Sequence, residues 1–210
     1  MNEYLMNPLI LEDESVFYQY INNFIERQKM HKDNLDNSTE AFYYLLSNEV
    51  MNQNLSNHMI VETANKINKL NELIVNGFRT RGEYIYGTNI KIPNAKELPL
   101  IVDGLLANYN MNILDDVFLN EAMLHIGLIT SQPFEDGNHR TAHLITNYNL
   151  IKQGIAPIII SEEIREMYDY LVYSRNLDSL ANLFRELSKS ENKYINSSFL
   201  NNPEVDNKHY

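Results

Sequence analysis

The sequence predicts a mainly α-helical fold that includes one short β-hairpin. Apolar residues recur at steps of three and four through most of the 210-residue chain, which is the period of helices with one buried face. Residues 82–93 instead alternate apolar and polar side chains with a period of two, between glycine and proline. With 44% hydrophobic residues the chain can bury one core, so we expect one domain with a short appendage.

One or two helices are expected in the first fifty residues, and one more follows in the first half of the chain. Their apolar periods lie over residues 14–27, 39–50 and 60–74, and the third is the longest and most clearly amphipathic. The hairpin at 82–93 follows. Because a single hairpin is only marginally stable in water, we expect it to pack on the helices and to leave one edge open to an extended partner peptide.

The apolar period of the second half of the chain predicts four more helices. Two lie over residues 114–128 and 142–151, and Gly154 is placed to cap the C-terminus of the second. Apolar residues cover a wide arc of segment 142–151, so we expect this helix to be central and largely buried. Ser161 and Asp178 are the expected N-caps of the two helices that follow.

Composition argues against several classes of function. The formal net charge of −11 leaves no basic field for a nucleic acid, and we find no basic amphipathic stripe for an anionic membrane. No apolar run approaches the ~18 residues of a membrane helix, and no basic and apolar leader begins the chain. Cysteine is absent, which fits a reducing compartment. We therefore expect a cytoplasmic protein, and the sequence leaves delivery into another cell open.

The stretch from Gln132 to Arg140, QPFEDGNHR, lies between the helices predicted over 114–128 and 142–151. Unpaired N–H groups and a partial positive charge at a helix N-terminus favour a phosphate. Asp136 could hold Mg²⁺ beside that phosphate, and Arg140 could neutralise it. Gln132 cannot accept a proton, because an amide has no usable pKa near neutrality. The stretch therefore predicts a site for an anionic nucleotide that lacks a general base.

These residues resemble the Fic/Doc (Fido) family. The family pattern His-x-Phe-x-(Asp/Glu)-Gly-Asn-(Gly/Lys)-Arg-x-x-Arg matches residues 132–143, except that Gln132, His139 and His143 replace the His, the Gly and the final Arg. The segment at 82–93 is similar to the family's flap hairpin. The resemblance implies a Fic-like helical bundle with a short β-hairpin flap.

The resemblance also implies a division of the chain. Residues 1–55 would form N-terminal helices, residues 56–188 the Fic-like core, and residues 189–210 a polar C-terminal tail. Because the chain is polar and rich in asparagine from about Ser188, we expect this tail to fray.

The implied activity is AMPylation, the transfer of AMP from ATP with Mg²⁺ to a hydroxyl of a protein target docked on the flap. Gln132 would stand at the position of the catalytic base, with Arg140 beside it, and Asp136 would be the metal ligand. The implied flap residues are Thr88, Asn89 and Ile90. The implied nucleotide-binding residues are Phe134, Gly137, Asn138, His139, Arg140, His143 and Tyr168.

The three departures leave three functions open. Loss of a general base typically lowers a rate by ~10²–10⁴-fold, which predicts a divergent transferase with weakened or altered activity. An inactive Fic-like binding or regulatory module is the alternative. The third function is that of a Doc-like protein kinase, which binds ATP in the reversed orientation and transfers a phosphoryl group. It is suggested by His139, which is bulky and can carry a positive charge where Doc-like members have Lys.

Several other residues of the sequence favour plainer, structural roles. His139 and His143 lie four apart, but two histidines without a third ligand are weak evidence for a metal site. His125 is expected to be a satisfied core residue. The closest match to the family's inhibitory pattern begins at Ser47 and places Met51 where its Glu belongs, with Glu49 two residues early. The sequence leaves open whether this match is an inhibitory motif, which protein is the target, and whether the chain forms a homo-oligomer.

Overall fold

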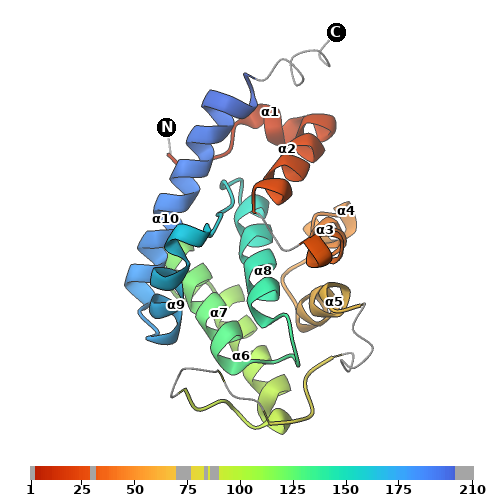
Figure 1. Ribbon diagram of the computed structural model, residues 1–210, viewed down its shortest axis with the longest axis vertical. Helices are drawn as coiled ribbons and strands as arrows, with labels where there is room; N and C mark the ends of the chain where they lie inside the picture. The colour runs from red at the N-terminus through yellow and green to blue at the C-terminus, as the bar shows by residue number, and fades with distance from the viewer. Residues whose placement is uncertain (1–2, 29–31, 70–76, 83–84, 86–89, 202–210) are drawn as a thin grey trace.

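Helices make up almost all the regular structure in a computed structural model of the protein, which describes residues 3–28, 32–69, 77–82, 85 and 90–201 (Figure 1). The α-helices are α1 (Pro8–Glu12), α2 (Glu14–Arg27), α3 (Lys32–Leu45), α4 (Asn48–Met51), α5 (Asn57–Ile67), α6 (Leu98–Asn110), α7 (Val117–Ser131), α8 (Asn138–Lys152), α9 (Arg165–Tyr173) and α10 (Leu177–Tyr194). Short 3₁₀ turns cover Ala95–Glu97 and Glu162–Ile164, and a π-helical turn covers Ile195–Phe199. The predicted mainly helical class is confirmed.

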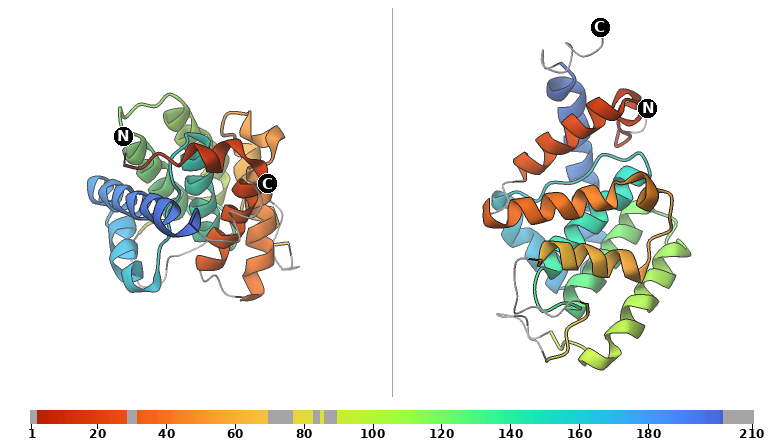
Figure 2. Two further views of the ribbon diagram at one scale, coloured as in Figure 1. Left: turned by 90° about the horizontal axis from the view of Figure 1, so that it is seen from above. Right: turned by 90° about the vertical axis from the view of Figure 1, so that its right-hand side faces the viewer.

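Helix α8 is the centre of the bundle. It lies between α7 on one side and α3 and α5 on the other, with α9 and α10 beyond α7 (Figures 1 and 2). Even polar side chains of α8 are buried: Asn147 has no exposed surface, and its amide exchanges hydrogen bonds of 2.8 and 3.1 Å with the backbone of Ile158. The prediction of a central, buried helix is confirmed, and Gly154 follows it at a positive φ of 70°, as a C-cap glycine should.

The expectation that the chain frays from about Ser188 is wrong for the residues that follow it up to Phe199. Helix α10 continues to Tyr194, and Ser188 donates a 2.6 Å hydrogen bond to the backbone of Ala156. Glu191 is 5% exposed, accepts a 2.8 Å hydrogen bond from the Tyr20 hydroxyl and pairs with Arg27. Ser188 and Glu191 are therefore satisfied by other parts of the fold, Ser188 by the chain that follows α8 and Glu191 by α2, rather than by water.

Several helix boundaries differ from the prediction. The helix expected over 39–50 is instead two helices, α3 and α4, with α3 beginning at Lys32. The amphipathic helix expected over 60–74 starts earlier, at Asn57, and ends at Ile67, while residues 70–76 lie outside the described part of the chain. The N-cap of α10 is Asn176, whose side chain accepts a 3.2 Å hydrogen bond from the N–H of Ser179; Asp178 lies within the first turn. An asparagine two residues earlier satisfies the helix end equally well.

The sequence pattern did not predict α6, and the structure does not confirm the hairpin. Residues 83–84 and 86–89, including Thr88 and Asn89, lie outside the described residues, and the remaining residues of segment 82–93 carry no strand. Ile90 is described and is partly buried. None of the helices in the described ranges is long and apolar enough to cross a bilayer.

Candidate functional site

The loop from Gln132 to Gly137 joins the end of α7 to the start of α8. Gln132 has a left-handed backbone with φ of 46°, which turns the chain sharply away from α7. Its side-chain amide donates a 2.7 Å hydrogen bond to the carbonyl of Ile129, and its Oε1 accepts a 3.0 Å hydrogen bond from Asn138. Both polar ends of the Gln132 side chain are thus bound by the two helices that flank the loop.

Asn138 holds the loop closed around Phe134. The Asn138 side chain is buried, accepts a 2.9 Å hydrogen bond from the Phe134 N–H and donates a 2.8 Å hydrogen bond to the Phe134 carbonyl. The Phe134 ring is 2% exposed and stacks on Phe78 with 5.9 Å between ring centroids. An apolar anchor and a two-way amide bridge therefore fix the loop, as a preorganised site requires.

Gly137 begins the helix at a position where a side chain would be strained. Its φ is +76°, and a Cβ built there would lie 3.1 Å from side-chain atoms of Asn68 and Ile67. The first backbone bond of α8 runs from the Thr141 N–H to the Gly137 carbonyl at 2.8 Å. Because a helix leaves its first N–H groups without partners inside the helix, the loop lies at a natural anion site.

Asp136 and Arg140 flank this helix end and form an ion pair at 3.1 Å. The Asp136 side chain is 60% exposed, whereas that of Arg140 is 22% exposed. One Asp136 oxygen accepts from the Gly137 N–H, and the Asp136 carbonyl accepts a 2.9 Å hydrogen bond from Asn68. The carboxylate and the guanidinium therefore lie within reach of a ligand and of each other.

The residues at this helix end fit Mg²⁺ in one of its usual binding modes. Mg²⁺ is commonly held by one or two carboxylates together with substrate phosphates and water. Asp136 offers an exposed carboxylate beside the proposed phosphate position, and the described residues contain no cluster of three or more His, Cys, Asp or Glu that could form an all-protein metal site. Within the described ranges, His139 and His143 likewise have no third metal ligand beside them.

His139 is neutral and bound to α9. Its Nε2 lies 2.7 Å from the Tyr173 hydroxyl, and burial lowers its pKa from 6.5 to about 4, with the nearby Arg165 adding to the effect. Its Nδ1 is buried without a hydrogen-bond partner in the described part of the chain. The imidazole therefore offers a phosphate no positive charge at neutral pH.

Behind His139 lies a buried cluster of His125, His143 and Tyr168. The Tyr168 hydroxyl is 2.6 Å from His125 Nε2, and His125 Nδ1 is 2.8 Å from Thr146 Oγ1. His125 is thus the satisfied core residue that was expected. Burial lowers the pKa of His143 to about 3. Tyr168, predicted near the nucleotide base, is fully buried and uses its hydroxyl within this cluster.

The segment that matched the inhibitory pattern lies near the opposite end of α8. The Val50 carbonyl accepts a 3.2 Å hydrogen bond from the Tyr148 hydroxyl, and the Gln53 carbonyl accepts one from Lys152. Helix α8 has 15 residues and is about 22 Å long, and Tyr148 and Lys152 belong to its last turns. Glu49 and Met51 are therefore not adjacent to the loop at 132–137.

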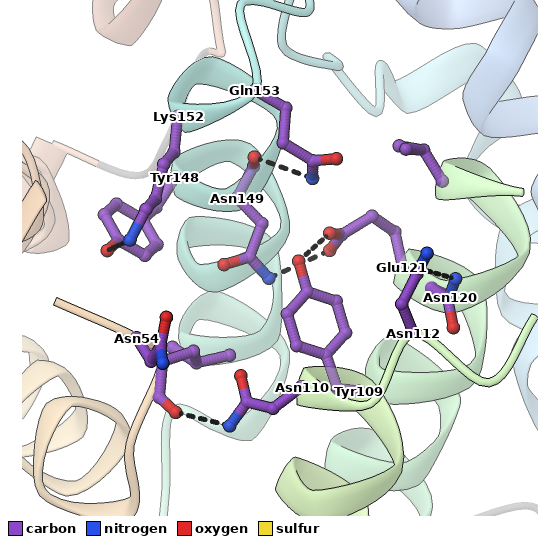
Figure 3. A pocket seen from close by; sticks show the side chains of 12 residues that line it. Asn54, Tyr109, Asn110, Asn112, Asn120, Glu121, Tyr148, Asn149, Lys152 and Gln153 are labelled. Carbon is purple, nitrogen blue, oxygen red and sulfur yellow. Dashed lines mark hydrogen bonds between the residues drawn. The ribbon is translucent and has the colours of Figure 1, made fainter. Parts of the chain in front are cut away.

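That same end of α8 carries a cavity of about 300 Å³, shown in Figure 3. The carboxyl of Glu121, which has no exposed surface, accepts hydrogen bonds from the Tyr109 hydroxyl at 2.5 Å and from Asn149 at 3.0 Å. Burial raises the pKa of Glu121 to about 8. The carboxyl is bound by neighbouring side chains, so we assign it a structural role.

Sequence patterns did not single out Arg79, which is 1% exposed and borders the loop. Its Nε donates a 2.6 Å hydrogen bond to the Gln132 carbonyl. The signal available in the sequence was weak, since a buried arginine cannot be told from a surface one without its acceptors. Asn68 was missed for the same reason, although it contacts both Asp136 and Arg140.

Known proteins match this region in sequence. The model of the Fic/DOC family matches residues 55–150. The protein adenylyltransferase fic-1 of Caenorhabditis elegans is 33% identical over 94 residues, which are 45% of this chain and 18% of that relative. The protein adenylyltransferase Fic of Aedes aegypti is 45% identical over 51 residues, which are 24% of this chain and 10% of that relative. The matched region thus spans less than a fifth of these curated relatives.

Solved structures match over a larger part of the chain. A Fic-domain-containing signalling protein from Bacteroides thetaiotaomicron superposes with a TM-score of 0.69 at 18% identity, over 76% of this chain and 70% of that one. Residues 134–508 of Fic-1 from C. elegans superpose with a TM-score of 0.66 at 22% identity, over 78% of this chain and 51% of that one. The fold, the family model and the sequence relatives agree on one region of this protein: residues 55–150 match the Fic/DOC family.

Proposed function

We propose that this protein binds a nucleotide with Mg²⁺ where α7 meets α8 and slowly transfers AMP to a hydroxyl of a protein target. The observation that carries the proposal is the start of α8. There a left-handed Gly137 opens a buried 15-residue helix, and Asp136 and Arg140 flank its N-terminus. Helix N–H groups, a guanidinium and an exposed carboxylate together match a phosphate with a bound cation.

Each residue at this site has a distinct role in the proposal. The first-turn N–H groups of α8 and Arg140 would bind the phosphates, and Asp136 would hold Mg²⁺, which supplies charge neutralisation when bound. Arg140 would then exchange its bond to Asp136 for one to phosphate. In the transfer, the target oxygen bonds to the α-phosphorus, the bond to the pyrophosphate oxygen breaks, and the hydroxyl proton leaves to solvent.

Gln132 limits the rate in this proposal. It stands where the family pattern has histidine, and an amide cannot accept the hydroxyl proton. Positioning and charge stabilisation supply most of the acceleration of phosphoryl-type transfer, so we expect a rate lower by ~10²–10⁴-fold rather than none. The target would dock on the segment that includes Thr88, Asn89 and Ile90.

One observation favours a second candidate, a Fic-like binding module without transferase activity. Both polar groups of the Gln132 side chain are used by the flanking helices, through the Ile129 carbonyl and Asn138. Gln132 is therefore suited to hold the loop rather than to meet a substrate. The kinase alternative is weaker, because it relied on a cationic His139, and the lowered pKa of about 4 leaves that ring neutral.

Labelling with radioactive ATP separates the candidates. The protein is incubated with Mg²⁺, cell lysate and either α- or γ-labelled ATP, beside Gln132→His and a matched Gln132→Asn, which also lacks a base. We expect weak label from α-labelled ATP in the native protein and in Gln132→Asn, and strong label in Gln132→His. Label gained only in Gln132→His supports the binding module, and label only from γ-labelled ATP supports the kinase.

A further inference from the structure

Arg79 joins its own segment, at Arg81, to two pieces of backbone that are distant in sequence, at Pro93 and at Gln132. Its guanidinium donates hydrogen bonds of 2.6 Å to the Gln132 carbonyl, 2.7 Å to the Arg81 carbonyl and 2.8 Å to the Pro93 carbonyl. A longer contact of 3.4 Å reaches the carbonyl of Ser131. The main-chain N–H of Arg79 adds a 2.9 Å bond to the carbonyl of Pro133.

The burial of this guanidinium has a clear electrostatic reason. Arginine stays charged at all ordinary pH values, so a buried guanidinium needs several oxygen acceptors. The carbonyls of Ser131 and Gln132 are at the C-terminus of α7, where a helix leaves its last carbonyls without partners and carries a partial negative charge. Arg79 therefore caps α7 at the residue where the loop begins.

The other branch of the guanidinium reaches both ends of one segment. Arg81 and Pro93 bracket residues 82–92, and both of their carbonyls accept from Arg79. The N–H of Thr80 supports the same junction with a 3.2 Å hydrogen bond to Glu135 in the loop. Both ends of the bracketed segment are thus tied, through one side chain, to Gln132.

We propose that Arg79 is a positioning residue that sets the entry and exit of segment 82–92 relative to Gln132. A protein target docked on that segment would then present its hydroxyl at a fixed place beside the N-terminus of α8. This role in docking rests on the proposed function. The coupling between the two backbone regions does not, and it can be measured without nucleotide.

Hydrogen exchange on the full chain tests the coupling. Arg79→Lys and Arg79→Gln are compared with Arg81→Gln, a matched control because the Arg81 side chain is exposed and only its carbonyl takes part. Lysine keeps the charge but cannot reach several separated acceptors at once. We expect both Arg79 variants to exchange on the order of tenfold faster in peptides that cover residues 80–82, 90–95 and 131–134, with α2 and α10 unchanged. Faster exchange in one region alone, or throughout the protein, overturns the proposal.

A second measurement addresses docking. Arg79→Lys and Arg81→Gln are introduced into whichever protein, native or Gln132→His, labels lysate with α-labelled ATP. We expect Arg79→Lys to keep the calorimetric Kd for ATP and Mg²⁺ within about twofold, because the hydrogen bonds of Asn138 still hold the loop closed. Transfer of AMP to protein should fall about tenfold, because the docked target is no longer held in place. Equal losses in the two variants contradict the docking role. If neither protein labels any target, the proposed function fails, and the exchange result still decides the positioning role.

Discussion

The two ends of α8 carry carboxylic acids in opposite environments. At its start, Asp136 is 60% exposed and is balanced by Arg140. Near its end, Glu121 of α7 is fully buried, bound by Tyr109 and Asn149, and has a pKa raised to about 8 (Figure 3). A cavity of about 300 Å³ is at the second end, yet the more exposed acid is at the first. We therefore base the proposed ligand site on the accessible charge at the start of α8 rather than on the cavity near its end.

The comparison predicts that removing Glu121 lowers stability far more than removing Asp136. Glu121→Ala would leave the Tyr109 hydroxyl and the Asn149 amide without their partner, and buried unpaired groups cost about 1–3 kcal/mol each. We expect a loss of roughly 3 kcal/mol in the free energy of unfolding, measured by urea denaturation. For Asp136→Ala we expect less than about 1 kcal/mol, since its ion pair is exposed. Equal losses would show that the two acids do not differ as described.

The glycines that bound α8 offer a second contrast. Gly137 and Gly154 both have positive φ, but a Cβ at Gly137 would crowd Asn68 and Ile67 at 3.1 Å, whereas at Gly154 the nearest atom is 3.6 Å away. We expect Gly154→Ala to cost about 1 kcal/mol from backbone strain alone and Gly137→Ala about 2 kcal/mol. Urea denaturation of both variants measures the difference. A larger cost at Gly154 would contradict the described crowding.

The pH dependence of stability sharpens the contrast further. Between pH 4.5 and about 8, folded Glu121 holds a proton that the unfolded chain has released. Stability from this group is therefore lost as pH rises through that range. Glu121→Gln cannot ionise, so its unfolding midpoint in urea should fall less than that of the native protein over the same range. Parallel pH profiles would show that Glu121 is ionised in the fold.

The smallest expected effect concerns His139, near the start of α8. Its pKa, lowered from 6.5 to about 4, means that the folded protein keeps this ring neutral while the unfolded chain protonates it. Stability from His139 is therefore lost as pH falls from 6.5 towards 4. An NMR titration of the imidazole signals, assigned with His139→Gln, should show a midpoint near 4. A midpoint near 6.5 would restore the cationic His139 on which the kinase alternative relies.

The sequence predicted the helices with strong apolar period, including buried α8 and its glycine cap. It did not predict α6, nor the extent of α10, where Glu191 is satisfied by Tyr20 and Arg27 from the other end of the chain. The motif located the loop, but not Arg79 or Asn68. Their roles depend on carbonyls and side chains that only the folded backbone brings near, and no local pattern encodes such acceptors.

Calorimetric titration with ATP and Mg²⁺ tests the central claim most directly, using the native protein, Asp136→Asn and Glu121→Gln. If the start of α8 is the nucleotide site, the native protein and Glu121→Gln bind with similar Kd, and Asp136→Asn weakens Mg²⁺-dependent binding by about tenfold or more. Absence of binding in the native protein, or equal binding in all three proteins, would contradict the assignment of the site.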